Sequence, residues 1–418
     1  MPTPIRFPRR FLWGASLSAH QAEGGTNNQW SSWEHENAKT LATQSPYQYG
    51  DLANWTDIAQ QARRADNYIS AEASDHWNRW REDIDLLEEL GLNTLRFSIE
   101  WSRIEPSEGG WSSSALEHYK QYLAELNKRK ITPIVTLFHF TLPQWFADKG
   151  GFAKRSNLVY FQRFVQKISD ELGGQLSYVI TINEPTIYAG QGYGSGAWPP
   201  NLTSRWLTWR VVRNLLTAHH QSAKILHQRS RRIQVSMAHN ISYVYAGDDA
   251  KLSIWSAKMI DWATNHYVLK RSLKSSDFIG VNYYFSNRVY GYRIHNPDER
   301  LSDVGWNMQP SHLQYVLEEL SERYKKPIIV TENGLADAKD SQRGWWLTET
   351  IQALWQARRS GAEVIGYVHW SLIDNFEWDK GRWPRFGLVA VDYITGRRTV
   401  RPSARSLAKL LPTLKGDR

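Results

Sequence analysis

Short apolar runs alternate with longer amphipathic stretches along most of this chain, and this alternation predicts its fold. The runs are rich in Ile, Val, Thr and Phe and poor in charge, which is typical of strands buried on both faces of a parallel sheet. All spacings between successive runs but the first are 37 to 56 residues, enough for one helix and its loops. The eight expected strands begin near Phe11, Thr94, Pro133, Ser177, Ile233, Phe278, Pro327 and Val364.

Eight units of this kind predict an α/β fold, a single (β/α)8 TIM barrel with long βα loops. No Gly/Ser-rich or Pro-rich linker divides the chain, so residues 1–418 are expected to form one domain. The intervening stretches have apolar residues three or four positions apart, as helices packed on a sheet do. Examples are Trp80, Ile84 and Leu87 before Gly91, then Leu313, Val316, Leu317 and Leu320, and a helix over 345–360 that stops at Gly361.

The first spacing, from Phe11 to Thr94, is about twice as long as the others. Its polar, aromatic-containing part from Gln21 to Tyr68 is interpreted as a long first βα loop on the active-site face. A partly disordered insertion is the alternative interpretation.

Composition limits the classes of protein that the chain can represent. No apolar run is long enough to span a bilayer, and the first residues, MPTPIRFPRR, lack the apolar stretch of a secretory signal, so we expect a cytoplasmic protein with no membrane partner. The absence of cysteine excludes disulfides and thiolate metal sites. The formal net charge of +9 raises the question of nucleic-acid binding. The basic residues are scattered in short clusters without a recognition signature, so surface solvation is the preferred explanation and no nucleic-acid partner is expected. The oligomeric state is left open.

Two apolar runs end abruptly in a glutamate: ITINEP at 180–185 and IIVTENG at 328–334. Barrel enzymes place their chemistry at the C-terminal ends of the strands, where Glu184 and Glu332 are expected. Hydrolysis of an acetal requires a proton for the departing oxygen and a carboxylate that stabilises or captures the oxocarbenium-like centre. Two carboxylates facing one cleft would meet both requirements.

Eight motifs, in order along the whole chain, resemble those of glycoside hydrolase family 1, the β-glucosidase and β-galactosidase family. A lone NEP tripeptide is a weak signal, whereas eight motifs in register are specific. They are FLWGASLSAHQAEG (11–24), TLRFSIEWSRIEP (94–106), TLFHFTLP (136–143), NEP (183–185), GVNYY (280–284), VGWNMQP (304–310), VTENG (330–334) and WSLIDNFEW (370–378).

The resemblance implies a retaining β-glycosidase that hydrolyses terminal non-reducing β-linked sugars by double displacement. Glu184 would be the general acid/base and Glu332 the nucleophile, with their carboxyl groups roughly 5 to 5.5 Å apart, against about 6.5 to 9.5 Å in an inverting enzyme. Arg96 is expected near Glu332, where its charge would favour the ionised nucleophile, and Tyr284 is expected to hydrogen-bond the same carboxylate. A structural ion pair of Arg96 with Glu100 is the alternative.

The resemblance also implies a sugar-binding set. Gln21 and Glu377 would hold hydroxyls on the far side of the ring, and His139 and Asn183 those near the reacting carbon. Aromatic packing would come from Trp370, Trp378 and, on the aglycone side, Trp306. Core packing is the alternative for any one of 21 tryptophans, as it is for a histidine on an apolar strand.

Several residues depart from the usual family pattern and are expected to alter the walls of the pocket. These are His20, Phe140, Thr141, Thr186 and Arg382, and Thr186 would open the leaving-group side. These departures leave the sugar preference open. The leading hypothesis from the resemblance is glucose, with galactose and fucose as alternatives. The other hypotheses are a transglycosylase that uses the same site and a carbohydrate-binding protein without activity. No cofactor and no metal are expected, because no phosphate-binding loop, HExxH or other metal-ligand motif is present.

Overall fold

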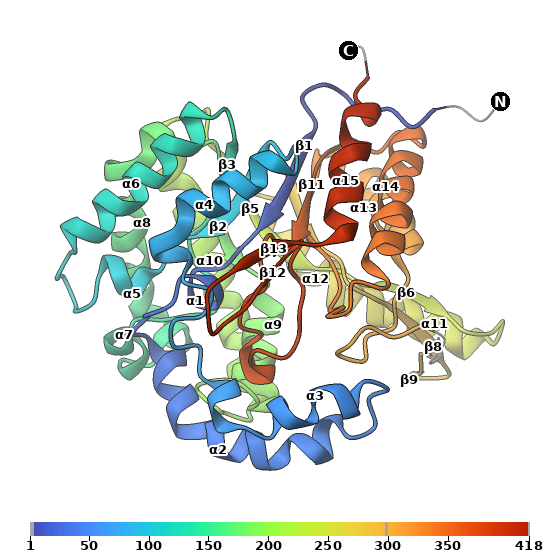
Figure 1. Cartoon of the computed structure of the whole chain (residues 1–418), viewed down its shortest axis with the longest axis horizontal. Helices are drawn as coiled ribbons and strands as arrows, with labels where there is room; N and C mark the ends of the chain where they lie inside the picture. Colours follow the sequence, from blue (N-terminus) through green and yellow to red (C-terminus); the bar gives the residue numbers. More distant parts are fainter. Residues whose placement is uncertain (1–3, 297–299, 417–418) are drawn as a thin grey trace.

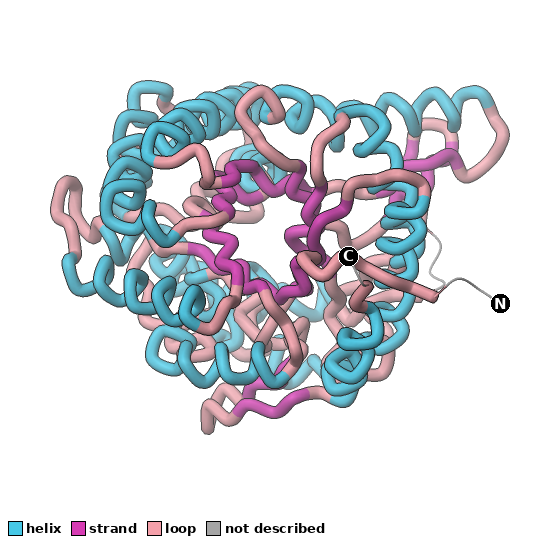
Figure 2. The backbone as a smooth tube through the Cα atoms, turned by 90° about the horizontal axis from the view of Figure 1, so that it is seen from above, coloured by secondary structure: helices cyan, strands magenta, loops and turns pink. Residues whose placement is uncertain are grey.

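The computed structural model describes residues 4–296 and 300–416, so the two ends of the predicted 1–418 domain lie outside it. Within these residues, eight parallel strands close into a barrel in the order β1-β11-β10-β7-β5-β4-β3-β2 (Figures 1 and 2). The barrel strands are β1 (Leu12–Ser16), β2 (Thr94–Ser98), β3 (Thr132–Thr136), β4 (Tyr178–Asn183), β5 (Gln234–Asn240), β7 (Ile279–Asn282), β10 (Ile328–Asn333) and β11 (Val364–Trp370). Each begins within one residue of its predicted start, so the predicted barrel is confirmed.

The ring closes where the first and last barrel strands pair, with Ser16 opposite Trp370. Side chains inside the barrel form their own apolar cluster, which includes Leu12, Ile134, Ile180 and Ile329. The outward-facing side chains pack against the surrounding helices in a larger core. Burial on both faces explains why these strands are continuous apolar runs in the sequence.

Helices surround the barrel, as Figure 2 shows from above. They are α1 (Ala19–Ala22), α2 (Gln29–Tyr49), α3 (Trp55–Ala62), α4 (His76–Glu89), α5 (Trp101–Ile104), α6 (Ser113–Lys128), α7 (Gln144–Asp148), α8 (Leu158–Leu172), α9 (Pro185–Ala189), α10 (Arg205–Arg229), α11 (Lys251–Asp261), α12 (Tyr267–Ser272), α13 (Leu313–Tyr324), α14 (Arg343–Arg359) and α15 (Pro402–Leu410). Helices α4, α13 and α14 confirm the three predicted from apolar spacing. No helix in the described ranges has the length and apolar character needed to cross a membrane.

Two small sheets lie outside the barrel. One consists of β6 (Tyr243–Ala246), β8 (Ser286–Tyr290) and β9 (Arg293–Ile294), and the other pairs β12 (Val389–Val391) with β13 (Arg398–Val400). In Figure 1, β8, β9 and the neighbouring helix α11 project from the side of the barrel.

The segment from Gln21 to Tyr68 lies between β1 and α4 on the cavity side, as predicted for a long first βα connection, but it is largely helical, so the alternative of a partly disordered insertion is wrong. At the start of α2, the Asn28 side chain accepts a hydrogen bond from the backbone N–H of Ser31 at 3.0 Å, and the Asn28 backbone N–H donates to Ser31 Oγ at 2.9 Å. This reciprocal capping satisfies backbone donors of the first turn. Trp30 then packs on Trp378 with ring centroids 4.8 Å apart, which fixes α2 across the carboxyl end of the barrel.

Candidate active site

A cavity of about 260 Å³ opens at the carboxyl end of the barrel strands. Its size is close to the lower end of the roughly 300 to 1,000 Å³ of ligand pockets, and its lining combines aromatic rings with a few polar groups. The structure gathers ten predicted site residues on its wall: Gln21, His139, Asn183, Glu184, Tyr284, Trp306, Glu332, Trp370, Glu377 and Trp378. Only Arg96 of the predicted set does not line it.

Glu184 occupies a sharp turn between strand and helix. Strand β4 ends at Asn183, and Pro185 begins α9, where the missing N–H of proline costs no hydrogen bond. Glu184 itself has φ of 39°, in the left-handed region that non-glycine residues rarely adopt. The turn brings its carboxylate to the cavity, where Oε1 accepts hydrogen bonds from Asn282 Nδ2 at 2.7 Å and Asn240 Nδ2 at 3.4 Å.

The environment of Glu184 favours its protonated form. Burial and the nearby negative charge of Glu332 raise the pKa of Glu184 to about 8, against the lowering effect of the two asparagine hydrogen bonds. At neutral pH this carboxyl group therefore holds a proton that it can donate.

Glu332 lies near the end of β10 in a different environment. One carboxylate oxygen forms an ion pair with the Arg96 guanidinium, and the other accepts a hydrogen bond from the Tyr284 hydroxyl at 2.7 Å. These two partners stabilise a negative charge. The alternative ion pair of Arg96 with Glu100 is wrong, since the side chain of Glu100 instead accepts from Thr141 and other neighbours.

The side chain of Arg96 lies behind the cavity wall. Its side chain is 1% exposed, and besides Glu332 it donates to Asn183 Oδ1 at 2.7 Å and Thr136 Oγ1 at 3.1 Å. It therefore does not line the cavity, although it lies beside Glu332 as predicted. It links β2 to the ends of β4 and β10 and so holds both predicted catalytic strands in register.

The contacts of Asn183 determine the tautomer of His139. Asn183 Oδ1 accepts from Arg96 and from Asn282 Nδ2, so its Nδ2 faces His139 Nε2 at 3.2 Å. Because an amide N–H donates, Nε2 must accept and the ring proton lies on Nδ1. Burial and the charge of Arg96 hold the pKa of His139 well below its usual value. Its buried Nδ1 has no partner among the described residues, so a neutral donor is free at the cavity wall.

The opposite edge of the cavity is formed by Gln21 and Glu377. Gln21 Nε2 donates to the Phe376 carbonyl at 2.7 Å and reaches Glu377 Oε2 at 3.4 Å. Burial raises the pKa of Glu377 to about 8, opposed by the charge of Lys380. Both side chains therefore present fixed polar atoms to a ligand.

Aromatic rings enclose these polar groups. Trp370 and Trp378 are both stacked with His139, with ring centroids 5.9 and 6.1 Å away. Trp306 packs edge-on against Tyr284 at 5.4 Å. Flat apolar surfaces with polar atoms at the edges suit a ring that has C–H faces and equatorial hydroxyls.

Of the five residues that depart from the family pattern, only Phe140 lines the cavity. The expectation that all five alter its walls is therefore wrong. His20 stacks with Trp378 at 5.7 Å, and Arg382 donates to the Ser70 carbonyl at 3.0 Å. Thr141 donates to Glu100, and Thr186 also lies outside the lining.

Sequence reasoning missed other residues of the wall. Asn240 on the wall and Asn282, which donates to Glu184 from behind it, could have been found, because each is a polar residue that ends a barrel strand. The remaining lining residues lie on loops or short helices, where no local signal marks them. They are Ile187, Gln191, Trp198, Phe285, Asp379, Lys380 and Phe386.

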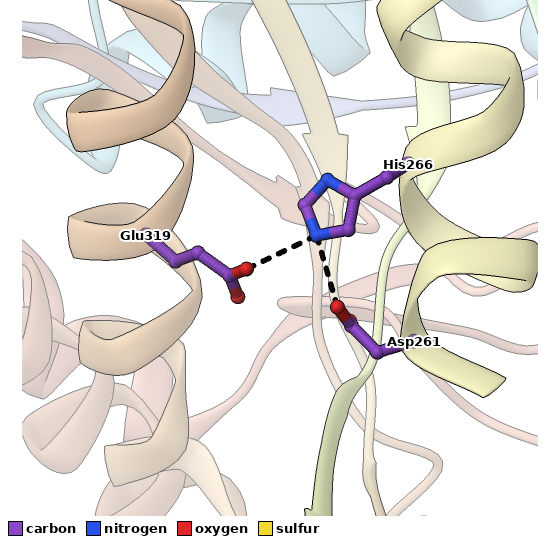
Figure 3. Close-up of side chains that lie close together, drawn as sticks. All are labelled: Asp261, His266 and Glu319. Carbon is purple, nitrogen blue, oxygen red and sulfur yellow. Dashed lines mark ion pairs between the residues drawn. The ribbon is translucent and has the colours of Figure 1, made fainter. Parts of the chain in front are cut away.

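Outside the cavity, His266 lies between Asp261 and Glu319, a grouping that could be considered as a metal site (Figure 3). His266 Nε2 is 3.0 Å from an Asp261 oxygen and 3.2 Å from a Glu319 oxygen. Burial lowers the pKa of His266, but its bonds to the two carboxylates outweigh this effect and raise it to about 9. In this structure the three side chains form an ion-pair network that joins the end of α11 to α13.

The comparisons with known proteins agree with this geometry. The family profile described as "Glycosyl hydrolase family 1" matches residues 3–270 and 258–415. The chain is 29% identical to Beta-glucosidase A of Thermotoga maritima, over 95% of this chain and 96% of the relative. It is also 29% identical to the Beta-galactosidase of Sulfolobus acidocaldarius, over 96% and 94% of the two chains.

A solved structure, the beta-glycosidase from Pyrococcus horikoshii, superposes with a TM-score of 0.86 at 32% identity and covers 100% of this chain and 97% of that one. The family match extends over nearly the whole chain and includes every barrel strand. The chain belongs to glycosyl hydrolase family 1 and is an O-glycoside hydrolase.

Proposed function

We propose that this protein is a retaining β-glucosidase that releases terminal glucose from the non-reducing end of β-linked glycosides. The observation that carries the proposal is the contrast between two carboxyl groups on one cavity. Glu332 is held by Arg96 and Tyr284, which favour the charged form, whereas burial keeps Glu184 protonated. A general acid must be protonated and a carboxylate nucleophile must be ionised at the same pH, and two such different environments allow this.

In the first step, the Glu332 carboxylate attacks the anomeric carbon as the bond from that carbon to the departing oxygen breaks. Glu184 donates its proton to that oxygen, so the aglycone leaves as an alcohol. The resulting ester removes the negative charge of Glu332, which is one of the causes of the raised pKa of Glu184. Glu184 can then accept a proton from water, which attacks the same carbon, restores Glu332 and releases the sugar with its configuration retained.

The other cavity residues position the sugar in this proposal. His139 Nδ1–H would donate to a hydroxyl, and Gln21 with Glu377 would hold hydroxyls at the far edge of the ring. Trp370 and Trp378 would pack against the C–H faces, and Trp306 against the aglycone.

We extend the proposal to the whole chain as one catalytic domain, since Phe7 N–H donates to the Leu414 carbonyl at 2.7 Å and thereby ties the two ends of the chain together.

The preference for glucose is supported by the relative named Beta-glucosidase A, while the one named Beta-galactosidase keeps galactose as the alternative. A panel of 4-nitrophenyl β-glycosides that differ only in the sugar tests this part. The largest kcat/KM is expected for the glucoside. A larger value for the galactoside or fucoside would overturn the sugar assignment and leave the mechanism intact.

Trapping of the glycosyl-enzyme tests the mechanism. A 2,4-dinitrophenyl 2-deoxy-2-fluoro-β-glucoside is expected to form a stable ester, seen as one added fluoroglucosyl group by intact mass and located by peptide mapping at Glu332. Glu184→Gln should still be labelled, because a good leaving group needs no proton, whereas Glu332→Gln should not. A label on another residue, or equal labelling of both variants, would refute the assignment.

A further inference from the structure

Helix α11 has its polar and apolar faces reversed. Its buried side is made of small residues, Ser253, Ser256 and Ala257, whereas large apolar residues face solvent. The exposed stripe is Leu252, Trp255, Met259 and, directly after the last residue of the helix, Trp262, with exposed fractions of 51, 61, 47 and 46%. A surface helix normally buries such a stripe, so this one presents a face that nothing in the described chain covers.

Exposed tryptophan is uncommon in this protein, and half of it lies on this face. All 21 tryptophans lie in the described residues, and only four are exposed: Trp255 and Trp262 here, and Trp206 and Trp209 on α10. Tryptophan is enriched where proteins meet the interface between a bilayer and water, because its ring is amphipathic.

The β8–β9 hairpin extends this face. The backbone N–H of Gly291, at the turn of the hairpin, donates to Ser253 Oγ of α11 at 2.8 Å. Tyr292 and Ile294 of the hairpin are exposed by 71 and 48%. We refer to Leu252, Trp255, Met259, Trp262, Tyr292 and Ile294 together as the α11 surface. In Figure 1 the helix and the hairpin project from the side of the barrel, where a flat partner can reach them.

Positive charges outnumber negative ones in the segments that form and flank the α11 surface. Residues 243–294, from the start of β6 to the end of β9, contain seven Lys and Arg against four Asp and Glu. Lys251 and Lys258 are exposed on α11 itself. Beyond it, Trp262 packs on Tyr267 at 5.5 Å between ring centroids, and the Arg271 guanidinium lies 3.8 Å from the Tyr267 ring centroid.

We propose that the α11 surface docks this protein on an anionic lipid bilayer. The apolar side chains would enter the boundary between headgroups and acyl chains, while the lysines and arginines contact lipid phosphates. Exposed leucine, methionine and isoleucine distinguish this surface from one that binds nucleic acid, because a nucleic acid has little apolar surface against which these side chains could pack. A second copy of the chain is disfavoured, because a two-fold interface would bring the same basic residues face to face.

Docking through this surface would place the cavity near the membrane. Phe285 lines the cavity, and the five residues of β8 lead from it to Tyr290 at the edge of the hairpin, a span of about 17 Å. This consequence rests on the proposed glycosidase function and names a substrate class: glycosides whose aglycone is anchored in the bilayer. The docking itself does not depend on the activity.

Sedimentation with vesicles tests the docking. The full chain is mixed with vesicles of phosphatidylcholine alone or with 30% phosphatidylglycerol. We expect it to pellet with the anionic vesicles, with binding weakened by salt and with tryptophan fluorescence quenched by brominated lipids. The double variant Trp255→Ser/Met259→Ser should lower the partition coefficient at least tenfold, and Lys251→Glu/Lys258→Glu should remove the preference for anionic lipid.

The matched control is Tyr47→Ser/Ile394→Ser, which removes two hydrophobic side chains exposed elsewhere by 89 and 96%. It should bind as the parent does. All three variants should keep the parental turnover of a water-soluble aryl glycoside, which separates a failure of docking from a failure of the proposed function. Absence of binding to either vesicle, or an equal loss in the control, would overturn the proposal. So would a dimer in sedimentation velocity that Trp255→Ser/Met259→Ser dissociates, since a second copy would then cover the surface.

Discussion

Neutralising Glu332 should make Glu184 a stronger acid. Burial is the largest cause of its raised pKa, and the negative charge of Glu332 is the next. At roughly 5.5 Å, the upper end expected for a retaining pair, two unit charges in an effective dielectric of about 20 interact by about 3 kcal/mol. The variant Glu332→Gln removes this repulsion, so the acid dissociation constant of Glu184 should increase roughly 100-fold.

The titration can be followed by NMR of protein labelled with ¹³C at the glutamate carboxyl carbon. The Glu184 signal is assigned by its loss in Glu184→Gln. In the parent protein its midpoint should lie at about pH 8. In Glu332→Gln it should move to lower pH but stay above the ordinary value, because burial persists.

Glu377→Gln is the control for this experiment. Glu377 is a second buried carboxyl group on the same cavity, yet it is not among the main causes of the raised pKa of Glu184. Its replacement should leave the Glu184 titration nearly unchanged. An unaltered midpoint in Glu332→Gln, or equal shifts in both variants, would refute the electrostatic coupling on which the proposed exchange of roles depends.

Three further outcomes are expected. Glu184→Ala should lower the turnover of an alkyl glucoside by about 10²- to 10⁴-fold and spare a 2,4-dinitrophenyl glucoside, as measured by steady-state kinetics; equal losses would argue against an acid role. In the unfolded chain Glu184 ionises near its ordinary pKa of 4.5 but in the folded chain only near 8, so stability falls as pH rises between these values. Glu184→Gln should therefore raise the free energy of unfolding by up to about 5 kcal/mol at pH 8 and by little at pH 4, as measured in urea, and an equal gain at both would contradict this reasoning. For His266, whose folded pKa is raised to about 9, the stabilisation is fully present below its ordinary value of 6.5 and lost as pH rises through about 9. His266→Gln should then lower the Tm strongly at pH 6 and weakly at pH 9.5; a constant difference would exclude the ion-pair network as its source.

The barrel could be predicted because its signal is local. A strand buried on both faces must be apolar along its whole length, so each of the eight strands can be recognised from a few consecutive residues. The helix α2 could not be recognised in this way, because it buries Trp30 and Trp33 among polar neighbours and so reads like a loop. Its start is encoded by the pairing of Asn28 with Ser31, a short signal that is common by chance.

Within the site, the two glutamates were predictable because each interrupts a buried strand, and the family motifs then supplied their neighbours. The direction of a side chain was not predictable from a motif. Gln21 lines the cavity while His20 beside it stacks behind Trp378, and Phe140 lines it while Thr141 turns to Glu100. The first pair belongs to the short helix α1 and the second to the loop after β3, and in each the two neighbours point to different sides, so proximity in sequence to a site residue does not imply contact with ligand.

Backbone conformation explains part of the difference in side-chain direction between neighbouring residues. Three residues of the cavity wall, Phe140, Glu184 and Trp378, have φ of 72°, 39° and 46°. Each such residue costs on the order of 1 to 3 kcal/mol and persists only when its surroundings determine it. Here the surroundings are the closed ring of strands and the helix α2 packed across its end, both of which are formed by contacts distant in sequence. The strained turns that direct these side chains toward the cavity therefore depend on the completed barrel. Local sequence is enough to identify Glu184 as the candidate acid, but it does not predict the turn that brings its carboxyl group to the cavity.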